Sequence, residues 1–322
     1  MTSIIEVYWN YLGRYLGHYI GKYIDLLPFA VSEMLLQLSL WFCVLICFCF
    51  VMGHQVSKYY FIGPIILFIM IGSQEISSLD WVPTAHRERI YERLSSPVIE
   101  KEELSLYLKR QQNFLNEFPS ELYKNAKSEP ELKLVNDSVA KALEALNLKP
   151  GREVMAIKEL WGVTRVLGLS YGGPAYHDVI TSEVVLATEK DYPASKAWRW
   201  MCIVHEVVHA QGFTREMDTE IITYLALKLS DDPLLKALSA WMALLKTGQS
   251  FDIPKVFKEE WNEVREKREE LHQPMVTLVK RVAEKLSVQN SNAKYGSVTK
   301  GTSIPLNHEF FASLVTFDEL GY

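Results

Sequence analysis

Residues 198–216 read WRWMCIVHEVVHAQGFTRE, and this stretch carries the strongest structural and chemical signal in the chain. Its apolar residues recur at helical spacing, which predicts a core helix over 194–211. Three polar side chains, His205, Glu206 and His209, interrupt the middle of that helix. Buried polar groups cost free energy unless they are bound, so we expect these three to serve one site.

The spacing of the three side chains is typical of a zinc hydrolase. His205 and His209 are four residues apart, so both imidazoles project from one helix face and can bind one tetrahedral zinc ion. Glu206 lies about 100° further around the helix axis, which places its carboxylate beside the open position of the metal. There Glu206 can act as general base, taking a proton from a water activated by the metal and passing it to the leaving group. The histidine and carboxylate donors favour zinc.

Such a zinc site needs a third protein ligand. Gly212 can turn the chain where the helix ends, as in the metzincins, but Arg215 stands where those enzymes carry their third histidine. We favour Glu216, the first residue of the next predicted helix, with Asp218 and Glu220 as alternatives; otherwise all three acids are surface charges. Glu220 shares a helix face with Glu216, so we expect it to accept a hydrogen bond from a ligand histidine and orient it.

Other candidates near the motif have simpler interpretations. Tyr171, Tyr176 and His177 precede the helix, and any of them can stabilise an oxyanion, although ordinary loop roles are the simpler interpretation. Cys202 lies three residues before His205 and shares its helix face. We interpret this cysteine as a packing residue.

The N-terminal region predicts a membrane anchor. Residues Met34 to Met52 carry no charge, and as a helix they span about 28 Å, the thickness of a bilayer core. A second uncharged run extends from Tyr59 to Gln74, and the short linker between the runs implies a hairpin; a buried hydrophobic helix is the alternative for this second run. No cleaved signal peptide is predicted, because the apolar run begins late and no small-residue cleavage site follows. Three cysteines in the first run are interpreted as small packing residues: Cys43, Cys47 and Cys49.

An internal repeat precedes the first apolar run. It reads YLGR, YLGH and YIGK, and places tyrosines and glycines four residues apart, as two stripes on a helix. Tyrosine stripes suit the membrane interface, and glycine stripes allow another helix to approach. The basic residues around the two runs mildly favour a cytoplasmic location for both ends of the hairpin. These are Arg14, Lys22, Lys58, Arg87, Arg89 and Arg93.

The remainder predicts an α+β domain that is mostly α. We divide the chain into an anchor, residues 1–80, and a catalytic domain with a small sheet, residues 81–322. The formal net charge of −5 is unlike that of a nucleic-acid binder. Short strands are expected within 153–188, including VITSEVVLAT at 179–188. Periodicity predicts helices over 100–118, 129–146, 216–229, 233–246 and 255–286, a loop over 287–300 and a short helix over 308–315.

The motif and its surroundings resemble those of a known family. HEVVHAQGFTREMDTE resembles the H-E-x-x-H-x-x-G-F-x-x-E signature of a bacterial family of uncharacterised membrane-anchored zincin-like proteins. The segments YLGHYIGKYIDLLPFAVSEMLL and LGLSYGGPAYHDVITSEVV resemble two further regions of that family. By this resemblance Glu216 corresponds to the first glutamate of the family's E-x-E-A-N pattern, similar to the E-x-x-A-D element of gluzincins. This chain departs from it, with Asp218, Thr219 and Glu220 in the later positions. The resemblance implies a catalytic domain outside the cytoplasm.

The sequence therefore predicts a membrane-bound zinc peptidase acting on a protein or peptide near the bilayer. One alternative is a non-catalytic, zinc-stabilised membrane scaffold that binds a protein partner. Against it, a purely structural metal site has no need of a general base at Glu206. A hydrolase of cell-wall or lipid material is a third interpretation, because the same zinc and base would serve it.

Overall fold

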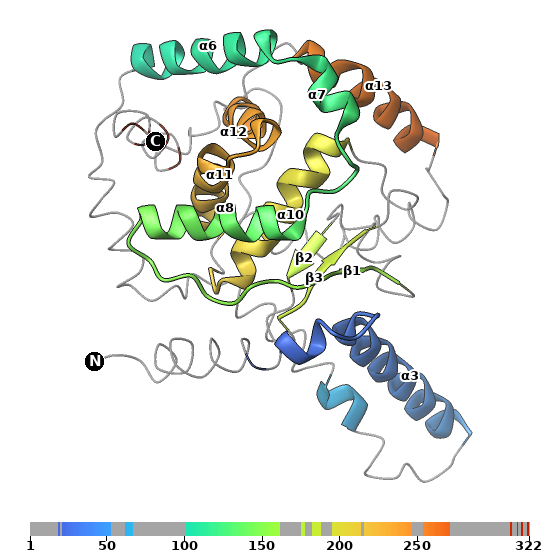
Figure 1. Cartoon of the computed structure of the whole chain (residues 1–322). Helices are drawn as coiled ribbons and strands as arrows, with labels where there is room; N and C mark the ends of the chain where they lie inside the picture. The colour runs from blue at the N-terminus through green and yellow to red at the C-terminus, as the bar shows by residue number, and fades with distance from the viewer. Residues whose placement is uncertain are drawn as a thin grey trace.

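The fold is that of a computed structural model, which consists mostly of helices with one small sheet (Figure 1). It describes the chain in separate ranges, together with a few single positions. These are residues 19, 21–52, 62–66, 101–161, 175–177, 182–187, 195–213, 216–246, 254–270, 310, 314, 317 and 321.

Four helices form the core of the globular part. Helix α11 (Glu216–Leu229) packs against α8 (Leu132–Ala145), α10 (Lys196–Ala210) and α12 (Pro233–Lys246). The middle of α11 is buried on every side and mostly apolar, and Ile221, for example, is completely buried, as expected of a helix enclosed by others. Three more helices border this core: α6 (Lys101–Glu117), α7 (Ser120–Asn125) and α13 (Lys255–Glu270).

The sheet has three short strands in the order β1-β3-β2: β1 (Ile157–Glu159), β3 (Val184–Leu186) and β2 (Ala175–His177). Strand β1 runs parallel to β3, and β2 runs antiparallel to it. Alternate side chains of a strand point to opposite faces. On β3, Val184 and Leu186 join the main core, where α10 also packs, whereas Val185 packs with Ala30 on the other face. The sheet therefore separates the motif helix from the N-terminal region.

The expected α+β class is confirmed at this level, and most of the differences lie at element ends. Helices α11 and α12 have the predicted bounds. Helix α8 begins at Leu132 and not at 129, because Pro130 disfavours helical backbone in the residue before it. Of the strand predicted over 179–188, the structure describes residues 182–187, and within these the strand covers Val184–Leu186. Ser182 before it has a φ of 58°, which is incompatible with an extended strand.

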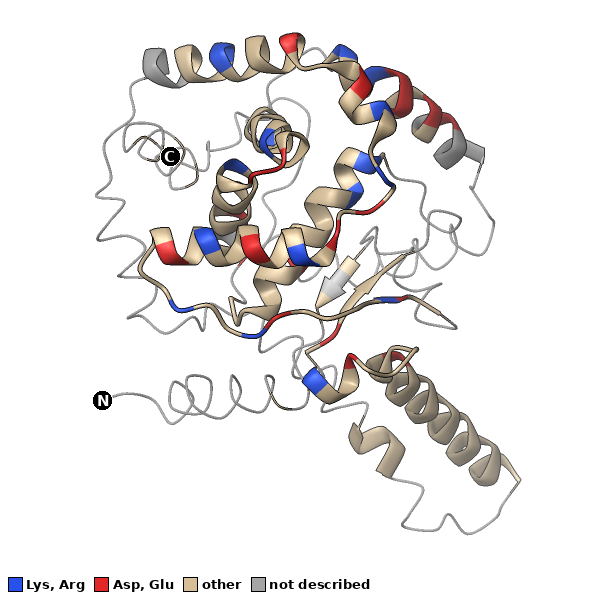
Figure 2. Ribbon diagram, in the orientation of Figure 1, with Lys and Arg blue, Asp and Glu red and all other residues tan. Residues whose placement is uncertain are grey.

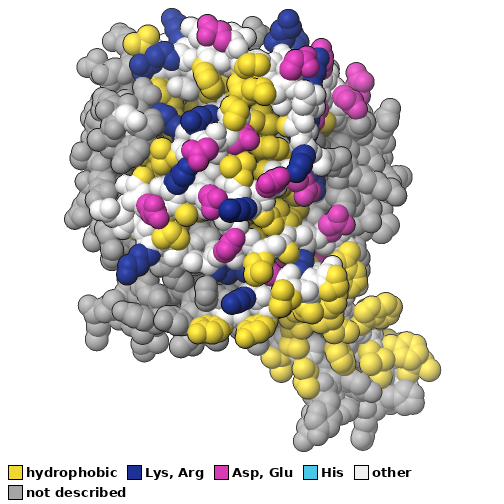
Figure 3. Space-filling model, in the orientation of Figure 1, with side chains coloured by type: hydrophobic (Ala, Val, Ile, Leu, Met, Phe, Trp, Pro, Cys, Tyr) yellow, Lys and Arg dark blue, Asp and Glu magenta, His cyan; other side chains and the backbone are white. Residues whose placement is uncertain are grey.

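One apolar helix projects from the globular part. Helix α3 (Val31–Val51) is the one helix among the described residues that is long and apolar enough to cross a membrane. Its only charged residue is Glu33 in the first turn, and Figure 2 shows the rest of the helix without charge. The space-filling view shows the region of α3 as a hydrophobic projection below the charged body of the protein (Figure 3).

Part of the predicted second membrane helix is also described. Residues 62–66 are helical, and a Cβ added at Gly63 would lie 2.2 Å from the Cβ of Phe42 in α3. Glycine thus allows these two segments to touch. The remainder of the second run, most of the tyrosine and glycine repeat, and the loop predicted over 287–300 lie outside the described residues. So does the end of the predicted helix over 255–286, whereas positions 310 and 314 of the predicted C-terminal helix are helical.

Candidate metal centre

The motif helix α10 begins and ends at residues suited to those positions. Ser195 caps it, and its Oγ accepts a hydrogen bond from the backbone N–H of Trp198 at 3.2 Å. Gly212 follows the helix with a φ of 96°, and its N–H donates to the carbonyl of His209 at 2.8 Å. Glycine adopts this conformation without steric cost, so the chain turns here, as the sequence predicts. Glu216 then begins α11.

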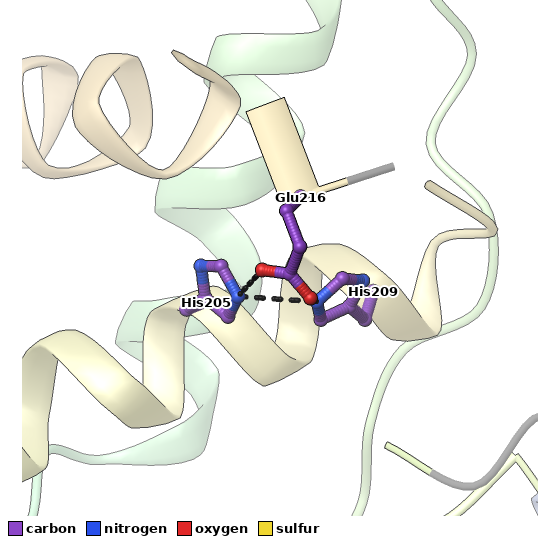
Figure 4. Close-up of side chains that lie close together, drawn as sticks. All are labelled: His205, His209 and Glu216. Carbon is purple, nitrogen blue, oxygen red and sulfur yellow. Dashed lines mark hydrogen bonds and ion pairs between the residues drawn. The ribbon is translucent and has the colours of Figure 1, made fainter. Parts of the chain in front are cut away.

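The two histidines and Glu216 converge on one point (Figure 4). The Nε2 atoms of His205 and His209 are 3.1 Å apart. Glu216 lies against both rings, with Oε2 at 3.2 Å from the Nε2 of His205 and Oε1 at 3.4 Å from the Nε2 of His209. Among the described residues, these three form the one group of His, Cys, Asp and Glu side chains placed to share a metal ion.

The three donor groups fit a zinc ion. Zinc–ligand bonds of about 2.0–2.1 Å in a tetrahedron separate neighbouring donor atoms by about 3.3 Å. The separations among His205, His209 and Glu216 are 3.1 to 3.4 Å, close to that spacing. Three protein donors is also the number typical of catalytic zinc sites, in contrast to four in structural sites.

His209 is held in the orientation that a metal ligand requires. Its Nδ1 donates to the backbone carbonyl of Phe213 at 2.6 Å, just beyond the turn at Gly212. The hydroxyl of Thr219 on α11 lies 3.3 Å from the same Nδ1 and donates to the Phe213 carbonyl at 3.0 Å. A proton on Nδ1 leaves the lone pair of Nε2 directed at Glu216 and His205.

Glu206 is buried beside this group, with 7% of its surface exposed. Burial raises the pKa of its carboxyl group, while the nearby His209 and His205 act in the opposite direction. A carboxylate with a raised pKa is a better proton acceptor at neutral pH than an exposed one. Glu206 thus has the environment of a general base.

The metal-free group forms a charged hydrogen-bonded cluster. Burial opposes the charged form of His209, but the hydrogen bond to Glu216 and the charge of Glu206 outweigh it and raise the pKa of His209. Removal from water also opposes ionisation of Glu216, yet hydrogen bonds to His205 and His209 hold the pKa of Glu216 well below its usual value. A cation would therefore compete with a proton for the donor atoms of this group.

The alternative acids are placed elsewhere. Glu220 forms an ion pair with Lys246 on α12, so our expectation that it orients a ligand histidine is wrong in this structure; Phe213 and Thr219 hold His209. Asp218 is completely buried and does not belong to the candidate ligand group. Cys202 packs against the hydrophobic core, which agrees with its predicted packing role.

A third histidine stands beside the centre. The ring of His177, on the edge strand β2, lies parallel to that of His209 with centroids 6.4 Å apart. Burial, with the positive charges of His209 and Arg152, lowers the pKa of His177 well below its usual value, so its imidazole is neutral. Of the three residues considered for oxyanion stabilisation, His177 is thus placed near the site. Tyr171 and the side chain of Tyr176 lie outside the described part of the chain.

The chain matches a protein family over most of its length. Residues 8–296 match a family described as "Protein of unknown function (DUF3810)". The match covers most of the chain, and its description names no metal and no activity. No curated protein and no solved structure shows a significant match.

Proposed function

Because the chain belongs to the DUF3810 family, whose description assigns no function, we propose from its site geometry that it is a membrane-anchored zinc-dependent hydrolase, specifically a peptidase. The observation that carries this proposal is the triangle of donor atoms from His205, His209 and Glu216, with edges of 3.1 to 3.4 Å. The buried carboxylate of Glu206 beside these ligands is the second feature that supports the proposal. A site with a purely structural metal would gain nothing from burying a second acid that does not bind the metal.

The residues divide the chemistry among them. His205, His209 and Glu216 hold the metal, and a zinc ion bound there supplies the Lewis acidity that polarises a carbonyl and activates water. Glu206 accepts a proton as the water oxygen attacks the carbonyl carbon of the peptide. It then returns this proton to the amide nitrogen as the C–N bond breaks, so that no net proton is consumed. His177 can donate a hydrogen bond to the oxygen on which negative charge develops.

The proposed membrane anchor rests on α3 and on the helical segment 62–66 beside it. Twenty-one residues of α3 form a helix of about 31 Å, long enough to span a bilayer core, and large apolar side chains such as Trp41 and Phe50 are exposed along it. The contact between Gly63 and Phe42 supports a second membrane helix that returns beside α3. We propose an extracytoplasmic catalytic domain, following the family resemblance. The predicted partners are a lipid bilayer and a protein or peptide substrate.

The test compares the purified full chain with its Glu206→Gln variant. Both are loaded with zinc, and cleavage of a pool of mixed-sequence peptides is followed by mass spectrometry. We expect cleavage by the parent protein, and a loss of at least a hundredfold in the variant at unchanged zinc content. Equal peptide patterns from the two zinc-loaded proteins would reject the peptidase and favour the zinc-stabilised scaffold. Lipid and cell-wall fragments, assayed in parallel, distinguish the other hydrolases.

A further inference from the structure

We propose that α3 is rigidly fixed to the metal-bearing domain and that the centre acts on polypeptide segments lying at the bilayer surface. The substrate clause rests on the proposed function, whereas the fixed attachment does not. The attachment consists of buried polar groups that bind residues 25–32, immediately before and within the first turn of α3. Four side chains form it: Asp25, Arg152, Lys158 and Glu183.

Glu183 caps α3 from the sheet. The first turn of a helix leaves backbone N–H groups without acceptors, and Ala30, at the cap position, offers no side-chain bond. Glu183 stands directly before β3 and is completely buried. Its two oxygens accept hydrogen bonds from the N–H groups of Val31 and Ser32 at 2.8 and 2.9 Å. The membrane helix thus begins on a carboxylate that belongs to the globular domain.

The residues before α3 are bound by two buried cations. Arg152 Nη1 lies 2.7 Å from Asp25 Oδ2, with 3% and 0% of the two side chains exposed. The backbone N–H of Met155 donates to the same oxygen at 3.0 Å. Lys158 Nζ donates to the carbonyl oxygens of Asp25, at 3.1 Å, and Leu27. These bonds fix both the side chain and the backbone of the entry segment.

The attachment distinguishes a membrane anchor that stays in the mature protein from a signal sequence that is cleaved off. Cleavage of a signal sequence at the end of α3 would remove the N–H groups of Val31 and Ser32 that Glu183 binds. It would also remove the carboxylate of Asp25 that pairs with Arg152, and breaking a buried ion pair is costly. It would also uncover Val185, which Ala30 now covers together with Leu160 and Ala187. The residues of α3 are therefore part of the mature fold.

Short connections lead from this attachment to the metal centre. Gln211, two residues after His209, bonds the backbone on both sides of the Gly151–Arg152 peptide: its Nε2 donates to the Arg152 carbonyl at 2.7 Å, and its Oε1 accepts from the Gly151 N–H at 2.6 Å. On the second route, His177 stacks on His209 and pairs in register with Val184, the neighbour of Glu183.

These two series of contacts limit the distance between the metal centre and the start of α3, and therefore the distance between the centre and the bilayer. The second route crosses one ring stacking, one strand pairing and one side chain, so His209 lies on the order of 20 Å from the first turn of α3. Because α3 leaves the domain at this point and points away from it, the bilayer begins close to the metal centre (Figure 1). A polypeptide segment emerging from the same membrane reaches the site, whereas one held far above the surface does not.

The attachment is tested by measuring the distance from the site to two points on the anchor. The full chain is reconstituted in phosphatidylcholine vesicles, with Cys43, Cys47, Cys49 and Cys202 replaced by alanine and cobalt in the metal site. A fluorophore is placed by Leu26→Cys or Val51→Cys, both at exposed side chains. Cobalt should quench the label at 26 strongly and the label at 51, about 30 Å further along the helix, very little. Weak or equal quenching at both, with one cobalt bound, would overturn the fixed attachment.

Hydrogen exchange gives a second reading that needs no metal. The amide of Met155 is protected in the parent protein through its bond to Asp25. We expect exchange in residues 150–160 to accelerate at least tenfold in Asp25→Ala, and to stay unchanged in the control Lys22→Ala, whose side chain is exposed. Fast exchange of Met155 in the parent chain would contradict the attachment.

The substrate clause is tested with mixed-sequence peptide pools carried by a lipid anchor. One pool follows the lipid directly, and the other stands on a rigid helical spacer of about 40 residues, roughly 60 Å long. We expect the surface pool to be cleaved at least ten times faster. Equal rates would reject the surface preference. No cleavage of either pool or of the free peptides, with zinc bound, would reject the proposed function while leaving the distance result standing.

Discussion

The Nε2 atom of His205 lies 3.1 Å from the Nε2 atom of His209, with the carboxylate of Glu216 against both. Two imidazole lone pairs cannot face each other at this distance without a proton or a metal ion between them. Both histidines project from the core helix α10, so the helix sets the relative positions of their backbones before any cation binds. Preorganisation of this kind lowers the cost of metal binding.

Removing one ligand should remove the metal. We expect the parent chain to hold one zinc per molecule, and His205→Ala, His209→Ala and Glu216→Ala each to lose it after dialysis against a weak chelator. Elemental analysis of the purified proteins provides the measurement. Cys202→Ala is the matched control, since Cys202 lies on α10 but outside the donor group, and it should keep its zinc. Zinc retained by both histidine variants would place the metal elsewhere.

Stabilisation by zinc should increase with pH. In the metal-free protein the pKa of His209 is raised above its ordinary value of 6.5, so its protonated form contributes stability below about pH 6.5 that is lost as the pH rises through the raised pKa. The pKa of Glu216 is lowered from 4.5, so its contribution is present above that pH and is lost on acidification. Zinc must displace the proton on His209, and its binding therefore strengthens as the pH rises through that same value.

Thermal unfolding with and without zinc checks this pH dependence. The difference in Tm between the two forms should be small at about pH 5 and should grow to several degrees by about pH 8. In His209→Ala the difference should vanish throughout the range. A difference in the parent protein that is constant over these pH values would contradict proton displacement from His209.

The sequence predicts the ligands but not the groups that orient them. Histidines four apart on a helix share a face by local geometry alone, and Gly212 marks the turn, so His205, His209 and Glu216 are readable from adjacent residues. The acceptor for His209 is the backbone carbonyl of Phe213, and a carbonyl has no sequence signature.

Pairings between residues far apart in the sequence could not be predicted from the sequence either. Glu220 pairs with Lys246, 26 residues away, and Glu183 caps a helix that begins about 150 residues earlier. Packing of whole elements decides such partners, whereas periodicity reports only on the residues within one element. For the same reason the helix bounds were predicted closely, while the attachment of α3 to the sheet was missed.

The two candidates for orienting His209 make opposite predictions. Thr219→Val removes a hydroxyl that lies within hydrogen-bonding distance of both the His209 ring and the Phe213 carbonyl. We therefore expect zinc affinity to fall by about tenfold, the lower end of the loss usually seen when a group that orients a metal ligand is removed. Glu220→Gln disrupts only the pair with Lys246 and should leave zinc affinity within about twofold. Competition with a chromophoric chelator measures both. A larger loss in Glu220→Gln than in Thr219→Val would restore the role expected from the sequence.

A substitution at Gly21 tests the buried ion pair between Arg152 and Asp25. A Cβ added there would lie 2.7 Å from the Cζ of Arg152, and the guanidinium has little room to move because it is buried against Asp25. Gly21→Ala should therefore displace Arg152 and cost about 3 kcal/mol of unfolding free energy, the lower end for breaking a buried ion pair. Denaturant unfolding in detergent measures this, with the neighbouring exposed Lys22→Ala as control, for which a change under about 0.5 kcal/mol is expected. If Gly21→Ala matches that control, Arg152 has an alternative position, and the pair with Asp25 does not hold the entry segment.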